Sequence, residues 1–187
     1  AARIRFSFQS LRDAPVEVNY TTFERVISAI GDGRIRVDRK VPPDSGGRYD
    51  WRPENGGDFY ARPARNSRIG KSYFIHEAVH ASIDLTRSTI FDIDNEVAAF
   101  LAQIFYLQGL LCPLTRITSR NTALAARLYE SLWRATNSVD RNGLIPEAQI
   151  RRVRRRIEEM PFYSYVLSDG CFDGESDCVY VLKIPNG

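Results

Sequence analysis

Both histidines of the 187-residue chain lie in one short segment, HEAVH, at residues 76–80. On an α-helix, His76 and His80 would occupy the same face, about 6 Å apart along the helix axis. Two imidazoles at that spacing can bind one cation, and zinc is the metal that most often accepts neutral imidazole nitrogens in tetrahedral geometry. The spacing therefore predicts a zinc site on a helix.

Glu77 follows the first histidine directly and could act on a water molecule held by the metal. On a helix its side chain lies about 100° round the axis from that of His76, so it would border the metal rather than bind it. A metal lowers the pKa of its bound water, and a carboxylate in this position can accept the proton and pass it to a leaving amine. We therefore expect Glu77 to be the general base of a hydrolase.

A third protein ligand is needed, because a catalytic zinc ion usually has three protein ligands and one open position. No third histidine exists in the chain, so a carboxylate or a cysteine must supply this ligand. Glu96 is the preferred candidate, since it lies in the first turns of the next predicted helix, which can return antiparallel to the first. Asp92 lies on the same face one turn earlier and is the alternative, whereas Asp94 and Asn95 are expected to face elsewhere.

Asp84 shares the helix face of the two histidines but cannot bind the same ion. It lies eight residues after His76, about 12 Å along a straight helix, and an aspartate side chain is too short to close that gap. Two interpretations remain open. Asp84 could accept a hydrogen bond from the far ring nitrogen of His80, or it could be a solvated charge near the end of the helix.

The segments HEAVH at residues 76–80 and NEVAA at residues 95–99 are together similar to the gluzincin family of zinc metallopeptidases. Members of this family carry H-E-x-x-H on one helix and a ligand glutamate on a later helix, often within N-E-x-x-A. The likeness covers residues 72–106. The same segments also resemble short bacterial metallopeptidase domains, some of which are carried by secreted toxins or effectors.

The resemblance implies a zincin-like fold, in which a small mixed or antiparallel sheet packs on the helix that carries H-E-x-x-H. It also implies that His76, His80 and Glu96 bind Zn²⁺ and that Glu77 is the general base in the hydrolysis of a protein or peptide substrate. In such folds an edge strand that precedes the metal helix often binds the substrate backbone. Residues 58–63, DFYARP, are a candidate for this strand, and an ordinary connecting segment is the alternative.

The sequence departs from the gluzincin pattern in three places. The spacing between His80 and Glu96 is short, and Phe100 stands where some members carry an aspartate. Those members also use a later histidine to stabilise the oxyanion, and this chain has none. Tyr163, Tyr165 or Arg68 would have to take that role, and the sequence does not choose among them.

Alternating and helical patterns predict an α+β fold, with strands at both ends of the chain and helices in the middle. We expect one domain: a strand-rich part over residues 1–70, a helical part with the metal site over 71–160, and strands over 161–187 around a loop closed by Cys171 and Cys178. That cysteine pair is either a local disulfide or two reduced thiols. The predicted strands are residues 3–9, 16–20, 34–41 and 58–63, and residues 42–57 are predicted to form a loop. The first predicted helix is capped by Thr21 or Thr22 and ends at Gly31, and the second begins near Ser72. Three further helices are predicted over residues 92–111, 120–136 and 146–159.

Charge and hydropathy argue against two classes of partner. The net charge of +3 is too small to indicate a nucleic-acid partner, and no segment approaches the ~20 apolar residues of a membrane span. The arginine-rich segment RRVRRR at residues 151–156 is typical of a solvated amphipathic helix, because its apolar residues form one stripe. On this helix the i, i+4 pairs Glu147–Arg151, Arg154–Glu158 and Arg155–Glu159 would be ion pairs.

The chain begins Ala1-Ala2, and its only methionine is Met160. We therefore expect a processed product or a part of a longer polypeptide, secreted or exported, with a cytoplasmic location as the alternative. The function expected from the sequence is zinc-dependent peptide hydrolysis, with a secreted effector or toxin as one setting for this activity. The alternatives are a non-catalytic binding or structural module that retains the metal site and, less favoured, an arginine-rich nucleic-acid-binding domain.

Overall fold

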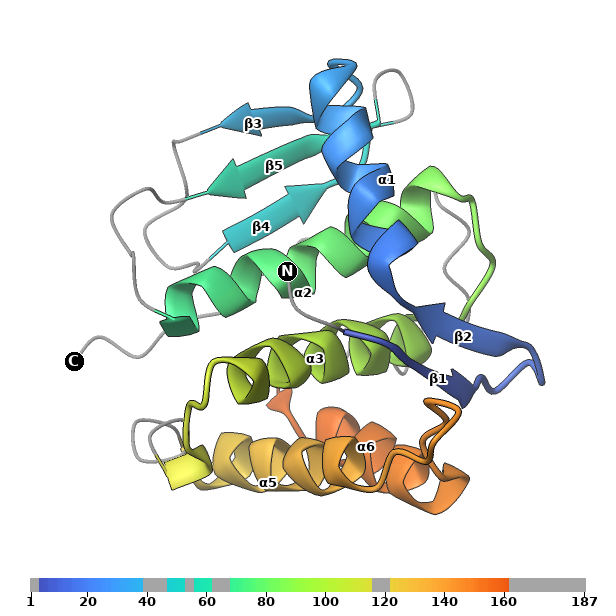
Figure 1. Cartoon of the computed structure of the whole chain (residues 1–187), viewed down its shortest axis with the longest axis vertical. Helices are drawn as coiled ribbons and strands as arrows, with labels where there is room; N and C mark the ends of the chain where they lie inside the picture. Colours follow the sequence, from blue (N-terminus) through green and yellow to red (C-terminus); the bar gives the residue numbers. More distant parts are fainter. Residues whose placement is uncertain (1–3, 39–46, 53–55, 62–67, 116–121, 162–187) are drawn as a thin grey trace.

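The computed structural model describes residues 4–38, 47–52, 56–61, 68–115 and 122–161, and it shows a mixed α+β architecture as predicted (Figure 1). Two small sheets are formed by the N-terminal part of the chain, and long helices follow. The elements are β1 (Phe6–Gln9), β2 (Pro15–Val18), α1 (Tyr20–Gly31), β3 (Arg36–Asp38), β4 (Gly47–Asp50), β5 (Asp58–Ala61), α2 (Arg68–Leu85), α3 (Asp92–Gly109), α5 (Ala123–Asn137) and α6 (Glu147–Glu158).

The first sheet is the antiparallel hairpin of β1 and β2, with Phe6 opposite Val18 and Phe8 opposite Val16. These four side chains alternate with polar ones and are buried, as expected for strands with one face on the core. They join a large cluster of apolar side chains, here called the helix core. Its largest fully buried members are Phe6, Phe8, Leu101, Ile104, Leu107, Leu128, Leu132, Ile145, Ile150 and Ile157.

The second sheet has the order β3-β5-β4, with β3 parallel and β4 antiparallel to β5. Its side chains form a separate cluster with α1 and α2, here called the sheet core: Val26, Ala29, Ile35, Tyr49, Phe59 and Ala81. Two predictions are wrong here. Residues 47–50 form β4 within the segment predicted to be a loop, and β5, from the segment DFYARP, is the central strand, so it is not an available edge.

Helix α1 begins at a different residue from the one predicted. Its N-cap is Asn19, whose side-chain oxygen accepts a hydrogen bond from the backbone N–H of Thr21 at 2.9 Å. The hydroxyl of Thr22 accepts the N–H of Asn19 in return at 3.1 Å, which completes a capping box. Thr22 therefore supports the cap rather than forming it, and the helix ends at Gly31 as predicted.

Helix α2 lies between the two cores. Val79 belongs to the helix core, whereas Ala81 belongs to the sheet core. The helix begins at Arg68, four residues before the predicted start, because the polar run before Ser72 has partners on α3. The Arg68 guanidinium donates to the Leu110 carbonyl at 2.8 Å, and the Gln103 amide donates to the Ser72 hydroxyl at 3.1 Å. These contacts show that α3 runs antiparallel to α2.

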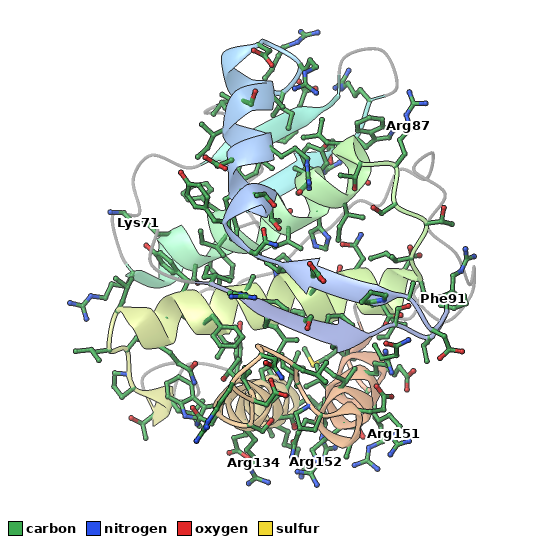
Figure 2. All side chains as sticks on the ribbon, turned by 45° about the vertical axis from the view of Figure 1, so that its right-hand side comes forward. Lys71, Arg87, Phe91, Arg134, Arg151 and Arg152 are labelled. Carbon is green, nitrogen blue, oxygen red and sulfur yellow. The ribbon has the colours of Figure 1, made fainter. Side chains whose placement is uncertain are left out.

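Helix α6 has the predicted apolar stripe, with Ile150, Val153 and Ile157 buried. Its exposed side carries Arg151 and Arg152, which point outward, as does Arg134 of α5 (Figure 2).

The expected ion pairs of α6 are only partly correct. Arg155 lies 4.0 Å from Glu159. Arg154 instead is 5% exposed and binds Glu147 and Asp94 rather than Glu158, so its assignment to the solvated side is wrong.

Among the described helices, none combines the length and apolar character that a membrane span requires. The predicted strands of residues 162–187, with Cys171 and Cys178, lie outside the described residues, as do Tyr163 and Tyr165. Cys112 is buried.

Candidate metal centre

The two histidines lie one turn apart on α2, as the HEAVH spacing predicted, and both imidazoles are buried. Their ring centroids are 4.8 Å apart at an interplanar angle of 74°. The ring of Phe100 on α3 lies 4.6 Å from that of His76 in an edge-on arrangement. Packing against α3 therefore holds the His76 ring, and both imidazoles face the same space between α2 and α3.

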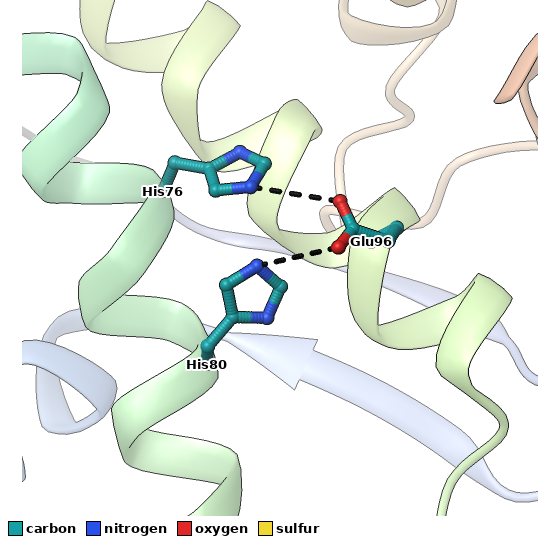
Figure 3. A group of neighbouring side chains, drawn as sticks. All are labelled: His76, His80 and Glu96. Atoms are coloured by element: carbon teal, nitrogen blue, oxygen red, sulfur yellow. Dashed lines mark ion pairs between the residues drawn. The ribbon is translucent and has the colours of Figure 1, made fainter. Parts of the chain in front are cut away.

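Glu96 of α3 faces the histidines from the other side of this space (Figure 3). Its Oε2 lies 3.6 Å from Nε2 of His76, and its Oε1 lies 3.7 Å from Nε2 of His80. Potential ligand atoms of the three residues all lie within 4.8 Å of one another. Among the described residues, this is the group of histidine, cysteine and acidic side chains that is arranged to bind a metal, and Asp92, the alternative ligand, is not part of it.

The spacing of these atoms suits a metal better than direct hydrogen bonds. A nitrogen–oxygen separation above 3.5 Å is too long for a hydrogen bond. Two ligand atoms that each lie ~2.0–2.1 Å from one tetrahedral zinc ion would be about 3.4 Å apart. Nε2 of His76 is buried and has no hydrogen-bond partner, which is costly unless something else binds it. The residues present therefore fit a divalent cation.

Burial keeps both imidazoles neutral. It lowers the pKa of His76 from 6.5 to about 3, and a contact with Gln103 opposes this only in part. Burial is also the main cause that lowers the pKa of His80 to about 4, while the carboxylate of Glu96 acts in the opposite direction. A neutral imidazole has a lone pair available for a metal, so both histidines are in the form that binds zinc.

Asn95 orients the second histidine, a role that the sequence prediction missed. Its Oδ1 lies 2.7 Å from Nδ1 of His80, and both atoms are buried. An amide oxygen only accepts hydrogen bonds, so Nδ1 carries the proton and Nε2, which faces Glu96, is the unprotonated nitrogen. The prediction that Asn95 faces elsewhere is wrong, because two adjacent residues of α3 can both border α2. The feature of the sequence that could have indicated this role is the position of Asn95 directly before Glu96.

Glu77 lies on the side of α2 that faces the second sheet. Its Oε2 accepts a hydrogen bond from the backbone N–H of Tyr49 on β4 at 3.1 Å, while its Oε1 is buried without a partner. Burial and then the charge of Glu96 raise its pKa well above the usual value, although the Tyr49 bond acts in the opposite direction. Glu77 is thus a buried carboxyl with one oxygen held by β4 and the other without a hydrogen-bond partner.

The position of Tyr49 depends on the glycine pair that precedes β5. The Tyr49 hydroxyl donates to the carbonyl of Gly56, and Gly57 has φ of +125°. A Cβ at Gly57 would lie 2.6 Å from the Asp50 carbonyl oxygen and 2.8 Å from the Tyr49 hydroxyl. Only glycine fits this approach, so the chain between β4 and β5 fixes the strand that holds Glu77.

Asp84 takes neither of the two predicted roles. It is 4% exposed, so it is not a solvated charge, and Asn95 rather than Asp84 occupies Nδ1 of His80. Its Oδ1 is buried without a hydrogen-bond partner, and burial raises its pKa from 3.8 to about 8. Its charge is also one of the causes, after burial, that raise the pKa of Tyr49.

Of the three residues predicted to stabilise an oxyanion, only Arg68 lies among the described residues, and it is not brought to the site. Arg68 lies two turns before His76, and its guanidinium is bound at the far end of α3 by Leu110. Tyr163 and Tyr165 lie outside the described residues.

Comparison with models of protein families, with curated protein sequences and with solved structures finds no match for this chain. The candidate site therefore stands on its own residues and their geometry.

Proposed function

We propose that the chain is a zinc-dependent hydrolase of peptide bonds, similar in its site to the gluzincins, with a zincin-like arrangement of sheet and helices. The observation that carries the proposal is the convergence of His76, His80 and Glu96 around one space, with Glu77 close enough for the charge of Glu96 to raise its pKa. Two neutral imidazoles and one carboxylate form a set of ligands typical of catalytic zinc. When bound, zinc would supply Lewis acidity and lower the pKa of water at the site.

The protein residues have separate tasks in this proposal. Asn95 holds the tautomer of His80 that presents Nε2, and Phe100 supports the ring of His76. Glu77 accepts a proton from a water molecule at the site through Oε1 and passes it to the leaving amine. The backbone N–H of Tyr49 keeps the carboxyl in place through Oε2. The substrate is a protein or peptide.

Substitution of Glu77 by Gln separates catalysis from metal binding. We expect Glu77→Gln to bind about one equivalent of zinc, as the unaltered chain does, because Glu77 is not a ligand. Cleavage of an internally quenched peptide library should fall by at least about 100-fold, because the amide cannot accept the proton. The control is His80→Ala, which should lose zinc and cleavage together.

Two outcomes would contradict the proposal. A reconstituted chain that holds less than about half an equivalent of zinc would exclude the metal centre. Equal cleavage by Glu77→Gln and the unaltered chain would exclude Glu77 as the general base. Stoichiometric zinc with no cleavage by either protein would favour a non-catalytic module that retains the site.

A further inference from the structure

Asp94 lies two residues before Glu96, and the two side chains leave α3 in nearly opposite directions. Two residues correspond to about 200° of rotation about a helix axis. Glu96 faces α2 and the histidines, whereas Asp94 faces α6 and the turn of the β1–β2 hairpin. Any contact that fixes Asp94 therefore also fixes the rotation of this turn of α3, and with it the direction of Glu96.

Arg154 of α6 binds Asp94 in a buried contact. Its Nε and Nη2 both lie 2.8 Å from Oδ1 of Asp94, and the side chain of Asp94 is fully buried. The same guanidinium donates to the backbone carbonyl of Gln9, at the end of β1, at 2.8 Å, and to Glu147 at 3.0 Å. One side chain therefore connects α3, α6 and the hairpin, and the planar geometry of arginine fixes the angles among them.

The hairpin adds two contacts of its own to the start of α3. The backbone N–H of Leu11 donates to Oδ2 of Asp94 at 2.8 Å, and the guanidinium of Arg12 lies 5.0 Å from the ring centre of Phe91. Phe91 is the N-cap of α3, and its side chain makes no capping hydrogen bond. The first turn of α3 is thus held by tertiary contacts through Asp94 instead of a local cap.

We propose that Asp94 and Arg154 are positioning residues of the metal site, which keep the Glu96 carboxylate opposite the two imidazoles. This inference rests on the proposed function, because it assumes that Glu96 is a ligand. Asp94 and Arg154 do not touch the metal or the substrate. They act by setting the rotation and height of the turn that carries Asn95 and Glu96, so their loss lowers metal affinity.

If Asp94 and Arg154 only stabilised the fold, replacing both would change the free energy of unfolding and leave zinc affinity unchanged. Replacing both members of a buried pair by neutral residues is often neutral or stabilising, because the cost of removing two charges from water disappears. The variant Asp94→Asn/Arg154→Met leaves no unpaired buried charge, and the amide oxygen of Asn can still accept the Leu11 N–H. The chain can therefore remain folded while the connection to α6 is lost.

The experiment measures zinc affinity by competition with a chromophoric chelator, and unfolding by urea, for the same proteins. We expect the double variant to unfold cooperatively and to bind zinc about 10- to 100-fold more weakly than the unaltered chain. Arg154→Lys, which keeps the charge without the planar fork, should lie between the two. The matched control is Arg155→Met on the same helix, whose side chain is 64% exposed and which should keep its zinc affinity within about twofold.

The outcomes are distinguishable. Unchanged zinc affinity in the folded double variant and in Arg154→Lys would overturn this inference and leave the proposed function intact. An equal loss of affinity in Arg155→Met would overturn it as well, since the effect would not belong to the buried pair. Absence of zinc binding by the unaltered chain would overturn the metal centre itself, and this inference with it.

Discussion

Burial controls the chemistry of the ionisable residues on α2. His76, Glu77, His80 and Asp84 are each no more than 4% exposed, so water cannot solvate their charged forms. Burial lowers the pKa of the two histidines and raises the pKa of the two acids. For the histidines this favours metal binding. For Asp84, which lies one turn beyond the site, burial has a direct consequence for stability.

Asp84 should make the stability of the metal-free protein depend on pH. Its pKa is about 8 in the folded chain and near 3.8 when solvated, so the folded state binds more protons than the unfolded state between these values. The free energy of unfolding should therefore fall as pH rises through this window. Asp84→Asn removes this contribution, and we expect it to be more stable than the unaltered chain at pH 9 by a few kcal/mol.

Urea unfolding of both proteins in a chelator at pH 6 and pH 9 measures this effect. The difference in free energy between Asp84→Asn and the unaltered chain should grow in favour of the variant between the two pH values. A difference that stays constant with pH would show that Asp84 is ionised in the folded chain.

The candidate ligands could be predicted from the sequence, and their supporting residues could not. Spacing alone places His76 and His80 on one helix face, and the absence of a third histidine directs attention to Glu96. The roles of Asn95 and Arg154 depend on the rotation of α3 and α6 against their neighbours, and the burial of Asp84 depends on what packs against the end of α2. Sequence spacing within a single helix does not contain that rotation, so all three were assigned to wrong surroundings.

At the scale of elements, β4 and the glycine pair before β5 connect the sheet to the site. β4 was hidden in the sequence because it lies in a segment rich in proline, glycine and aspartate, which is typical of loops. Its pairing with β5 and its contact with Glu77 are both tertiary. Helices with regular apolar spacing, such as α3 and α6, were predicted within two residues at each end because their pattern is local.

Substitution of Gly57 by Ala should destabilise the chain strongly. The new methyl group would meet the Asp50 carbonyl and the ring of Tyr49 at 2.6–2.8 Å, and φ of +125° is unfavourable for alanine. We expect a loss of about 2–4 kcal/mol in the free energy of unfolding, measured in urea. Gly31→Ala is the matched control, because a Cβ there meets no other part of the protein within 4 Å, and it should change the free energy of unfolding by no more than about 1 kcal/mol. Equal effects of the two substitutions would mean that the close approach of Tyr49 to Gly57 is not required.

At the scale of the whole molecule, the candidate site lies where two cores meet. α2 packs on the sheet core through Ala81, and α3 contributes Leu101, Ile104 and Leu107 to the helix core. The histidines come from α2 and Glu96 comes from α3, so a bound ion would join one core to the other. It would also offset the charge of the buried Glu96, which is one of the causes that raise the pKa of Glu77.

Zinc should therefore raise the thermal stability of the whole chain. At a free concentration 100 times its dissociation constant, a ligand that binds only the folded state adds about 2.7 kcal/mol, which for a chain of this length corresponds to a rise in Tm of about 5–10 °C. Scanning calorimetry with zinc and with a chelator measures this shift. Glu77→Gln should keep the shift because it retains all three ligands, whereas Glu96→Ala should lose it because the bridge between α2 and α3 is broken. If Glu96→Ala shows the same shift as the unaltered chain, zinc binds to the histidines or elsewhere without joining the two cores.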